Sequence, residues 1–287
     1  MYDRVKPAIK AGGFIFFLFI VSILISIPIL GAYALMGGDS DLIWAEDAST
    51  IEAALTSSFA LFVAVLCTAR IFKFSKNWAF SWSEVGIVKH KILSNLIKGI
   101  GIGILLILLS VLPLIAFDAI SITANNLAFA DLAGYLLVFC LVAIGEELLI
   151  RGYILSYLVK YYPRVFAVLI SAIIFSLLHI FNGNFNLLEC FNLILVGIFL
   201  AALKFRYQNL WVPVGTHFSW NFMQGSVLGF PVSGIDVPSI YLISFEENTI
   251  FNGGLFGIEG SILSTVVFIA LVIYLRNTLV ISEQNHD

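Results

Sequence analysis

The sequence predicts an all-α polytopic membrane protein with about eight transmembrane helices, built as a single integral membrane domain over residues 1–287. Composition is the first reason: hydrophobic residues make up 60% of the 287 residues, and charged residues only 11%. The mean hydropathy of +1.02 is far above that of a soluble domain. Several apolar runs also exceed the roughly 18 residues that indicate a membrane-spanning helix.

Apolar runs place these helices along the chain. The first run follows a basic head, and because its apolar part is longer than that of a signal peptide, we interpret it as a transmembrane helix. Within the third run, the sequence GIGIG at 99–103 offers a face of small residues for helix packing. The predicted spans are residues 12–36, 51–70, 93–117, 132–158, 165–181, 187–204, 210–230 and 258–275.

The distribution of charges predicts the orientation of these helices. With a cytoplasmic N-terminus, all 15 Lys and Arg residues fall in segments on the cytoplasmic side. The outward segments contain acidic residues instead. An excess of Lys and Arg marks cytoplasmic loops, so we expect the N- and C-termini to lie in the cytoplasm.

Two connecting segments differ from plain loops. The segment 76–91 mixes Trp with Lys and is expected to lie on the cytoplasmic membrane surface. The outer stretch 231–257 carries Gly, Pro and acids, and forms either a lid or a long loop. Glu189 and Glu259 are expected near the outer ends of their helices, without a catalytic role.

Polar side chains lie deep inside three of the predicted spans. Such groups are costly in mid-membrane and indicate function by default. With a rise of ~1.5 Å per residue, the carboxylates, imidazoles and amide fall near the middle of a hydrocarbon core about 30 Å thick. The residues are Glu146, Glu147 and Arg151 in 132–158, His179 in 165–181, and His217 and Asn221 in 210–230.

Helical spacing groups these side chains. Residues four positions apart share a helix face, so Glu147 pairs with Arg151, and a buried structural ion pair is the simplest interpretation. Glu146 is rotated by about 100° from Glu147 and points elsewhere. The same spacing relates Phe175 to His179, and His217 to Asn221.

One carboxylate, two imidazoles and an amide suit the attack of water on an acyl carbon. A carboxylate with a histidine can hold and deprotonate a water molecule. A histidine with an asparagine amide can donate hydrogen bonds to a developing oxyanion. The alternative is a zinc ion held by Glu146, His179 and His217, with water in an open position.

Three motifs occur in order on these helices. EELLIR at 146–151 fits EExxxR, FSLLH at 175–179 fits FxxxH, and HFSWN at 217–221 fits HxxxN. Together they resemble the CPBP intramembrane proteases, also called the Abi or type II CAAX prenyl endopeptidase family. The resemblance covers residues 130–225, which we expect to form the catalytic core.

The resemblance implies a role for each motif residue. Members of the family were long labelled metalloproteases, and a metal-independent glutamate mechanism is also proposed for them. The chain contains no HExxH motif, so no cofactor is favoured and zinc stays the alternative. Glu146 and His179 match the water-activating pair, His217 and Asn221 match the oxyanion-stabilising pair, and Glu147, Arg151 and Phe175 match supporting positions.

The sequence thus predicts an intramembrane endopeptidase that cuts a membrane-associated peptide or protein, with prenylated CAAX-type substrates as one class. We expect it in the bacterial plasma membrane, with the lipid bilayer as its surroundings, an active site open to the cytoplasm and no nucleic-acid partner. The alternatives are a transporter or proton relay, and a non-catalytic immunity or scaffold protein. The sequence shows no internal repeat of the kind that would favour a transporter. All the motif residues are present, whereas a non-catalytic scaffold could lack some of them. Substrate identity and oligomeric state stay open.

Overall fold

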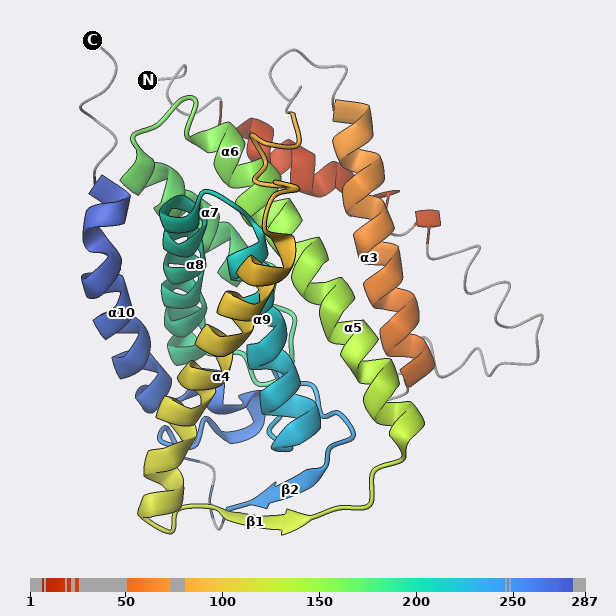
Figure 1. Ribbon diagram of the computed structural model, residues 1–287, viewed down its shortest axis with the longest axis vertical. Helices are drawn as coiled ribbons and strands as arrows, with labels where there is room; N and C mark the ends of the chain where they lie inside the picture. The colour runs from red at the N-terminus through yellow and green to blue at the C-terminus, as the bar shows by residue number, and fades with distance from the viewer. Residues whose placement is uncertain are drawn as a thin grey trace, which may run out of the picture.

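The computed structural model is mostly helical, and its long helices run side by side along the long axis of the molecule (Figure 1). This confirms the predicted all-α class, apart from one short pair of strands. The structure describes residues 51–72, 81–245, 247 and 249–280, together with 7, 9–18, 20, 21, 24 and 25. Most of the first predicted span, 12–36, lies outside the described residues, and so do both chain termini.

Among the described residues, four helical stretches are long and apolar enough to cross a membrane. One of them is a continuous rod made of α5 (Phe129–Glu147), the π-helix η1 (Leu148–Ile154) and α6 (Leu155–Leu158). The others are α4 (Ile92–Ala116), α8 (Leu187–Tyr207) and α10 (Ile262–Val280). These helices indicate an integral membrane protein, whereas the count of eight spans and the orientation of the termini stay predictions.

Three further predicted spans correspond to other helices. They are α3 (Ile51–Phe72), whose apolar part is the shorter stretch Ala54–Arg70, the short α7 (Arg164–Leu177), and α9 (Trp211–Phe222), which continues into the π-helix η2 (Met223–Val227). The fifth predicted span was extended too far, because α7 ends at Leu177 and residues 178–186, rich in Asn with one Gly, form turns instead.

The last predicted span was also begun too early. Gly257 adopts a φ of 106°, which a helix does not permit, and Ile258–Gly260 form a 3₁₀ turn, η4. Ser261 then caps the helix, because its hydroxyl oxygen accepts the backbone N–H of Ser264 at 3.0 Å. α10 therefore begins at Ile262 and leaves Glu259 outside the helix.

Close packing of α4 against α9 explains two glycines of the GIGIG sequence. A methyl group at Gly99 would lie 2.2 Å from the carbonyl oxygen of Val212, and one at Gly103 would lie 2.1 Å from the hydroxyl oxygen of Ser219. A methyl group at Gly101, by contrast, would meet no atom within 4 Å. The predicted small-residue packing face is confirmed, and it sets how closely α4 approaches the helix that carries His217.

One end of the bundle, here called the strand end, carries the short strands β1 (Ser121–Ala124) and β2 (Tyr241–Ser244) in antiparallel register. The predicted lid or long loop folds over this end, and it contains β2 and the 3₁₀ turn η3 (Gly254–Phe256). Its first part, residues 231–237, is called the cap segment below. The amide of Asn182 donates to the Ser233 carbonyl at 3.0 Å, and the Gly234 N–H donates to the Phe256 carbonyl at 3.0 Å.

The opposite end of the bundle is covered by residues 81–91, the described part of the predicted interfacial segment. The indole N–H of Trp211 donates to the Val88 carbonyl at 2.9 Å, and the Leu210 N–H donates to the Gly86 carbonyl at 2.8 Å. Hydrogen bonds from the Ser81 backbone N–H and hydroxyl hold the pKa of Glu84 below its ordinary value. This segment therefore joins the bundle mainly through its backbone.

Candidate active site

A cavity of about 370 Å³ lies inside the bundle, between α3, α5, α7, α8, α9 and the cap segment. Its wall is mainly apolar, with a few polar side chains that converge on it, as is usual for small-molecule and catalytic sites. Of the residues predicted for the site, five line this cavity: Glu146, Phe175, His179, His217 and Asn221.

The two neighbouring glutamates of α5 point to different places, as the helical rotation of about 100° predicts. Glu146 faces the cavity, and its Oε2 atom lies 3.9 Å from Nε2 of His217. This oxygen is buried and accepts no hydrogen bond from the described part of the chain. A buried carboxylate oxygen without a donor is unfavourable, so the site is suited to a water molecule or a substrate group beside Glu146.

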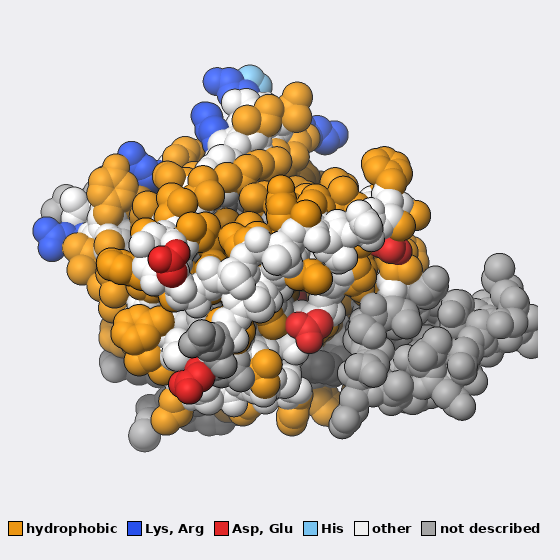
Figure 2. Space-filling view, turned by 90° about the horizontal axis from the view of Figure 1, so that it is seen from below, with side chains coloured by type: hydrophobic (Ala, Val, Ile, Leu, Met, Phe, Trp, Pro, Cys, Tyr) orange, Lys and Arg blue, Asp and Glu red, His pale blue; other side chains and the backbone are white. Residues whose placement is uncertain are grey.

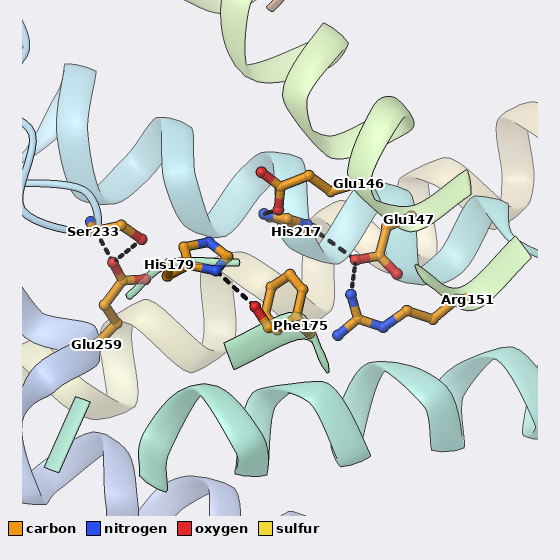
Figure 3. Close-up of polar contacts among 8 residues, drawn as sticks. All are labelled: Glu146, Glu147, Arg151, Phe175, His179, His217, Ser233 and Glu259. Carbon is orange, nitrogen blue, oxygen red and sulfur yellow. Dashed lines mark hydrogen bonds and ion pairs between the residues drawn. The ribbon is translucent and has the colours of Figure 1, made fainter. Parts of the chain in front are cut away.

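Glu147 is completely buried and binds two side chains through one oxygen (Figure 3). Its Oε1 atom accepts hydrogen bonds from Nη1 of Arg151 at 2.9 Å and from Nδ1 of His217 at 3.0 Å. The predicted ion pair with Arg151 is thus confirmed, but the contact with His217 is additional. Because an ionised carboxylate can only accept, Nδ1 carries a proton, and Nε2 is left to face Glu146.

His179 lies in the turn after α7 and not within a helix, which corrects its predicted position in the fifth span. Its Nδ1 atom lies 2.9 Å from the Phe175 carbonyl oxygen near the end of α7. Since a carbonyl only accepts, Nδ1 is the donor and Nε2 is the nitrogen that can take up a proton. The turn still places the ring in the cavity.

The Phe175 ring joins the two halves of the site. It contacts the edge of the His179 ring at a centroid distance of 4.9 Å, and the guanidinium of Arg151 lies 4.2 Å from its centroid. A cation over an aromatic face is stabilised by the ring quadrupole. Phe175 therefore supports both the buried ion pair and the orientation of His179.

Asn221 follows His217 by one helical turn on α9 and lines the same cavity. Its side chain is mostly buried and forms no hydrogen bond with another described residue. Directly beyond Asn221 the helix becomes π-helical, and the helix that carries Glu146 and Glu147 does the same directly beyond them. Single π-turns inside α-helices occur frequently at functional sites.

The comparison with protein families agrees with this geometry. Residues 128–223 match the family model of the type II CAAX prenyl endopeptidase Rce1-like proteins. The match covers about a third of the chain and contains every motif residue named above. No curated protein matches the chain. The family resemblance drawn from the three motifs is therefore confirmed, and the match supports a membrane-bound peptidase.

The arrangement of the candidate site tests the zinc alternative. Among the residues that the structure describes, no three His, Cys, Asp or Glu side chains come together closely enough to hold a metal ion. Glu146, His179 and His217 line one cavity, but they do not form such a cluster. In this arrangement the three residues do not fit a resident zinc ion.

Two residues outside the motifs also belong to this site and were not predicted. Glu259, in η4, lines the cavity together with Ser233 of the cap segment, whose hydroxyl donates to Oε1 of Glu259 at 2.7 Å. Desolvation by burial raises the pKa of the Glu259 carboxyl, whereas the hydrogen bonds from Ser233 lower it. A lone acid within the otherwise apolar stretch LFGIEGSIL was the one sequence signal for this position.

Lys204 binds the helix of Glu147 close to the candidate site. Its ammonium group is buried and donates to the Arg151 carbonyl at 2.5 Å and to the Ser156 hydroxyl at 2.7 Å. The π-helical turn changes which backbone carbonyls find a partner within the helix, and Lys204 supplies a donor to one of them. From the sequence, Lys204 is expected only as a basic residue at the cytoplasmic end of the predicted span 187–204.

Proposed function

We propose that the chain is an intramembrane endopeptidase that hydrolyses a peptide bond of a membrane-associated substrate, with prenylated CAAX-type substrates as the first class to test. The observation that carries this proposal is the convergence of Glu146, His179, His217 and Asn221 on one cavity inside the bundle. The buried Glu147 holds the ring of His217 in place at this point. The family match supports peptidase activity.

In this proposal Glu146 and His179 activate water. The carboxylate of Glu146 and Nε2 of His179 hold a water molecule, which loses a proton to them as its oxygen attacks the peptide carbonyl carbon. The proton then passes to the leaving nitrogen, the C–N bond breaks, and a carboxylate and an amine are released. A carboxylate in a mainly apolar cavity is suited to this proton transfer.

His217 and Asn221 stabilise the oxyanion of the tetrahedral intermediate. The Nε2 atom of His217, when protonated, and the amide NH₂ of Asn221 are the donors, and Glu147 favours the charged imidazole through Nδ1. Loss of a single oxyanion donor lowers kcat by about 10²–10³-fold in other hydrolases.

Cleavage by purified protein in detergent tests the proposal. The substrates are a prenylated CAAX-type peptide and a library of peptides from membrane proteins. We expect cleavage by the wild type and by His90→Ala, an exposed histidine outside the cavity, but not by Glu146→Ala or His179→Ala. Cleavage by all four proteins at the same rate would reject the catalytic assignment and favour a contaminating protease.

The positions of charged residues support one orientation of the bundle in the membrane. Figure 2 looks onto the strand end and shows acidic side chains across it, whereas the Lys and Arg side chains lie toward the edge of the view. We propose that the strand end faces outward in a bacterial plasma membrane and that the site opens to the cytoplasm. A cysteine at position 162 should react with a membrane-impermeant thiol reagent only in inside-out vesicles, and reaction in intact cells would contradict the orientation.

A further inference from the structure

Glu259 occupies the end of the cavity near the cap segment and is distant in sequence from the three motifs. The residue is 6% exposed and lines the cavity. Its Oε1 atom accepts hydrogen bonds from both the backbone N–H and the hydroxyl of Ser233 (Figure 3). One carboxylate oxygen is therefore fully occupied within the protein.

The second oxygen of Glu259 is in a different situation. No described residue donates a hydrogen bond to Oε2, and in Figure 3 this oxygen points toward His179 and the interior of the site. The imidazoles of His179 and His217 line the same cavity and, when protonated, favour the ionised form of this carboxylate, but neither donates a hydrogen bond to Oε2. A donor that enters the cavity from outside the chain would complete the hydrogen bonding of Oε2.

The charges around the cavity indicate which kind of donor fits. Among the described residues that line it, Glu146 and Glu259 are the acids, and none is Lys or Arg. Arg151 lies nearby but is paired with Glu147, and it does not line the cavity. The two imidazoles of the cavity, His179 and His217, are the other groups that can carry charge. At the Glu259 end, where Oε2 lacks a donor, the carboxylate attracts a cation and repels another carboxylate.

The carboxylate of Glu259 is also held in a fixed position. The cap segment that contains Ser233 is bound through its backbone to Asn182 and to Phe256, and the amide of Gln224 donates to the Pro231 carbonyl at 2.6 Å. On the other side, the amide of Asn192 donates to the Glu259 carbonyl at 2.9 Å. A group held in this way loses little conformational entropy when a ligand binds.

We propose that Glu259 forms a substrate-binding subsite in which Oε2 binds a basic side chain, Lys or Arg, located next to the bond to be cut. This inference rests on the proposed peptidase function and adds a substrate class to it. Substrates with a basic residue beside the scissile bond are favoured, and substrates with an acidic residue at the same place are rejected. A CAAX-type substrate satisfies this rule if the residue that follows its Cys is Lys or Arg and if its terminal carboxylate, about 10 Å beyond the scissile bond in an extended chain, points away from Glu259.

The selectivity between matched peptides tests the subsite. From the first peptide that the wild type cleaves, variants are made with Lys, Gln or Glu at one position on either side of the scissile bond. For one of these positions, we expect kcat/KM for the Lys peptide to exceed that for the Glu peptide by at least about tenfold, because one charge pair at an effective dielectric constant near 20 exceeds this factor even when desolvation cancels much of it.

Glu259→Gln is the decisive variant. The amide oxygen of Gln can still accept both hydrogen bonds from Ser233, so the fold is kept while the charge is lost. The ratio between the Lys and Glu peptides should fall to near one. Ser233→Ala, which removes one of the two bonds, should lower the ratio partly, and Glu247→Gln, an exposed acid of the strand end outside this cavity, should leave it unchanged.

Binding to the Glu146→Ala variant gives a second readout that needs no turnover. The Lys peptide should bind this variant more tightly than the Glu peptide, and the added change Glu259→Gln should remove the difference. The subsite would be overturned if the wild type cleaved the three peptides with the same kcat/KM. It would also be overturned if the preference for the Lys peptide remained in Glu259→Gln. Absence of cleavage by the wild type would contradict the peptidase function instead, while the binding difference would still report on Glu259.

Discussion

Glu147 and His217 form a hydrogen bond of 3.0 Å between Oε1 and Nδ1, although they lie on different helices and 70 positions apart in the chain. The same oxygen of Glu147 accepts the guanidinium of Arg151. The second glutamate of the first motif therefore does more than stabilise its own helix. It fixes the ring orientation and the protonated nitrogen of a histidine that belongs to the third motif.

Replacement of Glu147 by Gln should test this link. The amide lacks the negative charge that favours a protonated Nδ1 and a charged ring, so the tautomer of His217 is no longer fixed. We expect kcat to fall by about 100-fold or more with a small change in KM, by analogy with the asparagine variant of a serine-protease triad. Steady-state kinetics of the purified protein give both parameters. An unchanged kcat would show that the contact between Glu147 and His217 has no part in the reaction.

The packing of α4 on α9 makes a prediction with a matched control in the same helix turn. In Gly103→Ala the new methyl group collides with Ser219 and the Thr216 carbonyl, which should lower stability by about 1–3 kcal/mol and displace His217. Gly101→Ala meets no neighbour, so it should be neutral or slightly stabilising. Thermal unfolding in detergent and peptidase assays measure both effects. Equal stability of the two variants would contradict the close helix contact.

Lys204 should be needed for the π-helical turn that follows Glu147. Lys204→Met keeps the length of the side chain but leaves the Arg151 carbonyl without its donor, at a cost of about 1–3 kcal/mol. Amide hydrogen exchange should become faster in residues 148–156, which contain the turn. Arg206→Met, an exposed position on the same helix, is the control and should leave this exchange unchanged. Unaltered exchange in Lys204→Met would exclude the supporting role.

Metal removal addresses the alternative that the sequence left open. Because the described His, Cys, Asp and Glu residues do not gather into a metal-binding cluster, we expect cleavage to survive prolonged treatment with a strong chelator. The assay uses protein dialysed against the chelator, with metal content measured by mass spectrometry. Loss of activity that added zinc restores would show that Glu146, His179 and His217 rearrange to bind a metal.

Contacts within a single helix were predictable from spacing. The pair formed by Glu147 and Arg151 follows directly from a separation of four residues, and so does the different direction of Glu146. The packing glycines Gly99 and Gly103 were also identified, because small residues at helical spacing leave room for a neighbouring helix.

Contacts between helices were not predictable, because they depend on how the helices rotate and shift against each other. Spacing does not tell which glutamate of α5 meets His217. The structure assigns the hydrogen bond to Glu147, while Glu146 lines the cavity. Hydropathy placed His179 inside a helix, whereas the chain turns before it. Glu259 reaches the cavity through turns at Gly253, Gly254 and Gly257, which no periodic pattern describes.

The two π-helical segments have a consequence for how this protein tolerates changes in length. Each behaves as though one extra residue had been inserted into an α-helix just beyond the catalytic side chains. Removal of one residue from either segment would restore ordinary α-helical winding and turn the two parts of the helix by about 100° relative to each other. Glu147 and the Arg151 carbonyl that binds Lys204, or Asn221 and the Gln224 amide that binds the cap segment, would then no longer keep their relative positions. The exact number of residues in these segments is therefore as much a part of the active site as the identity of its side chains.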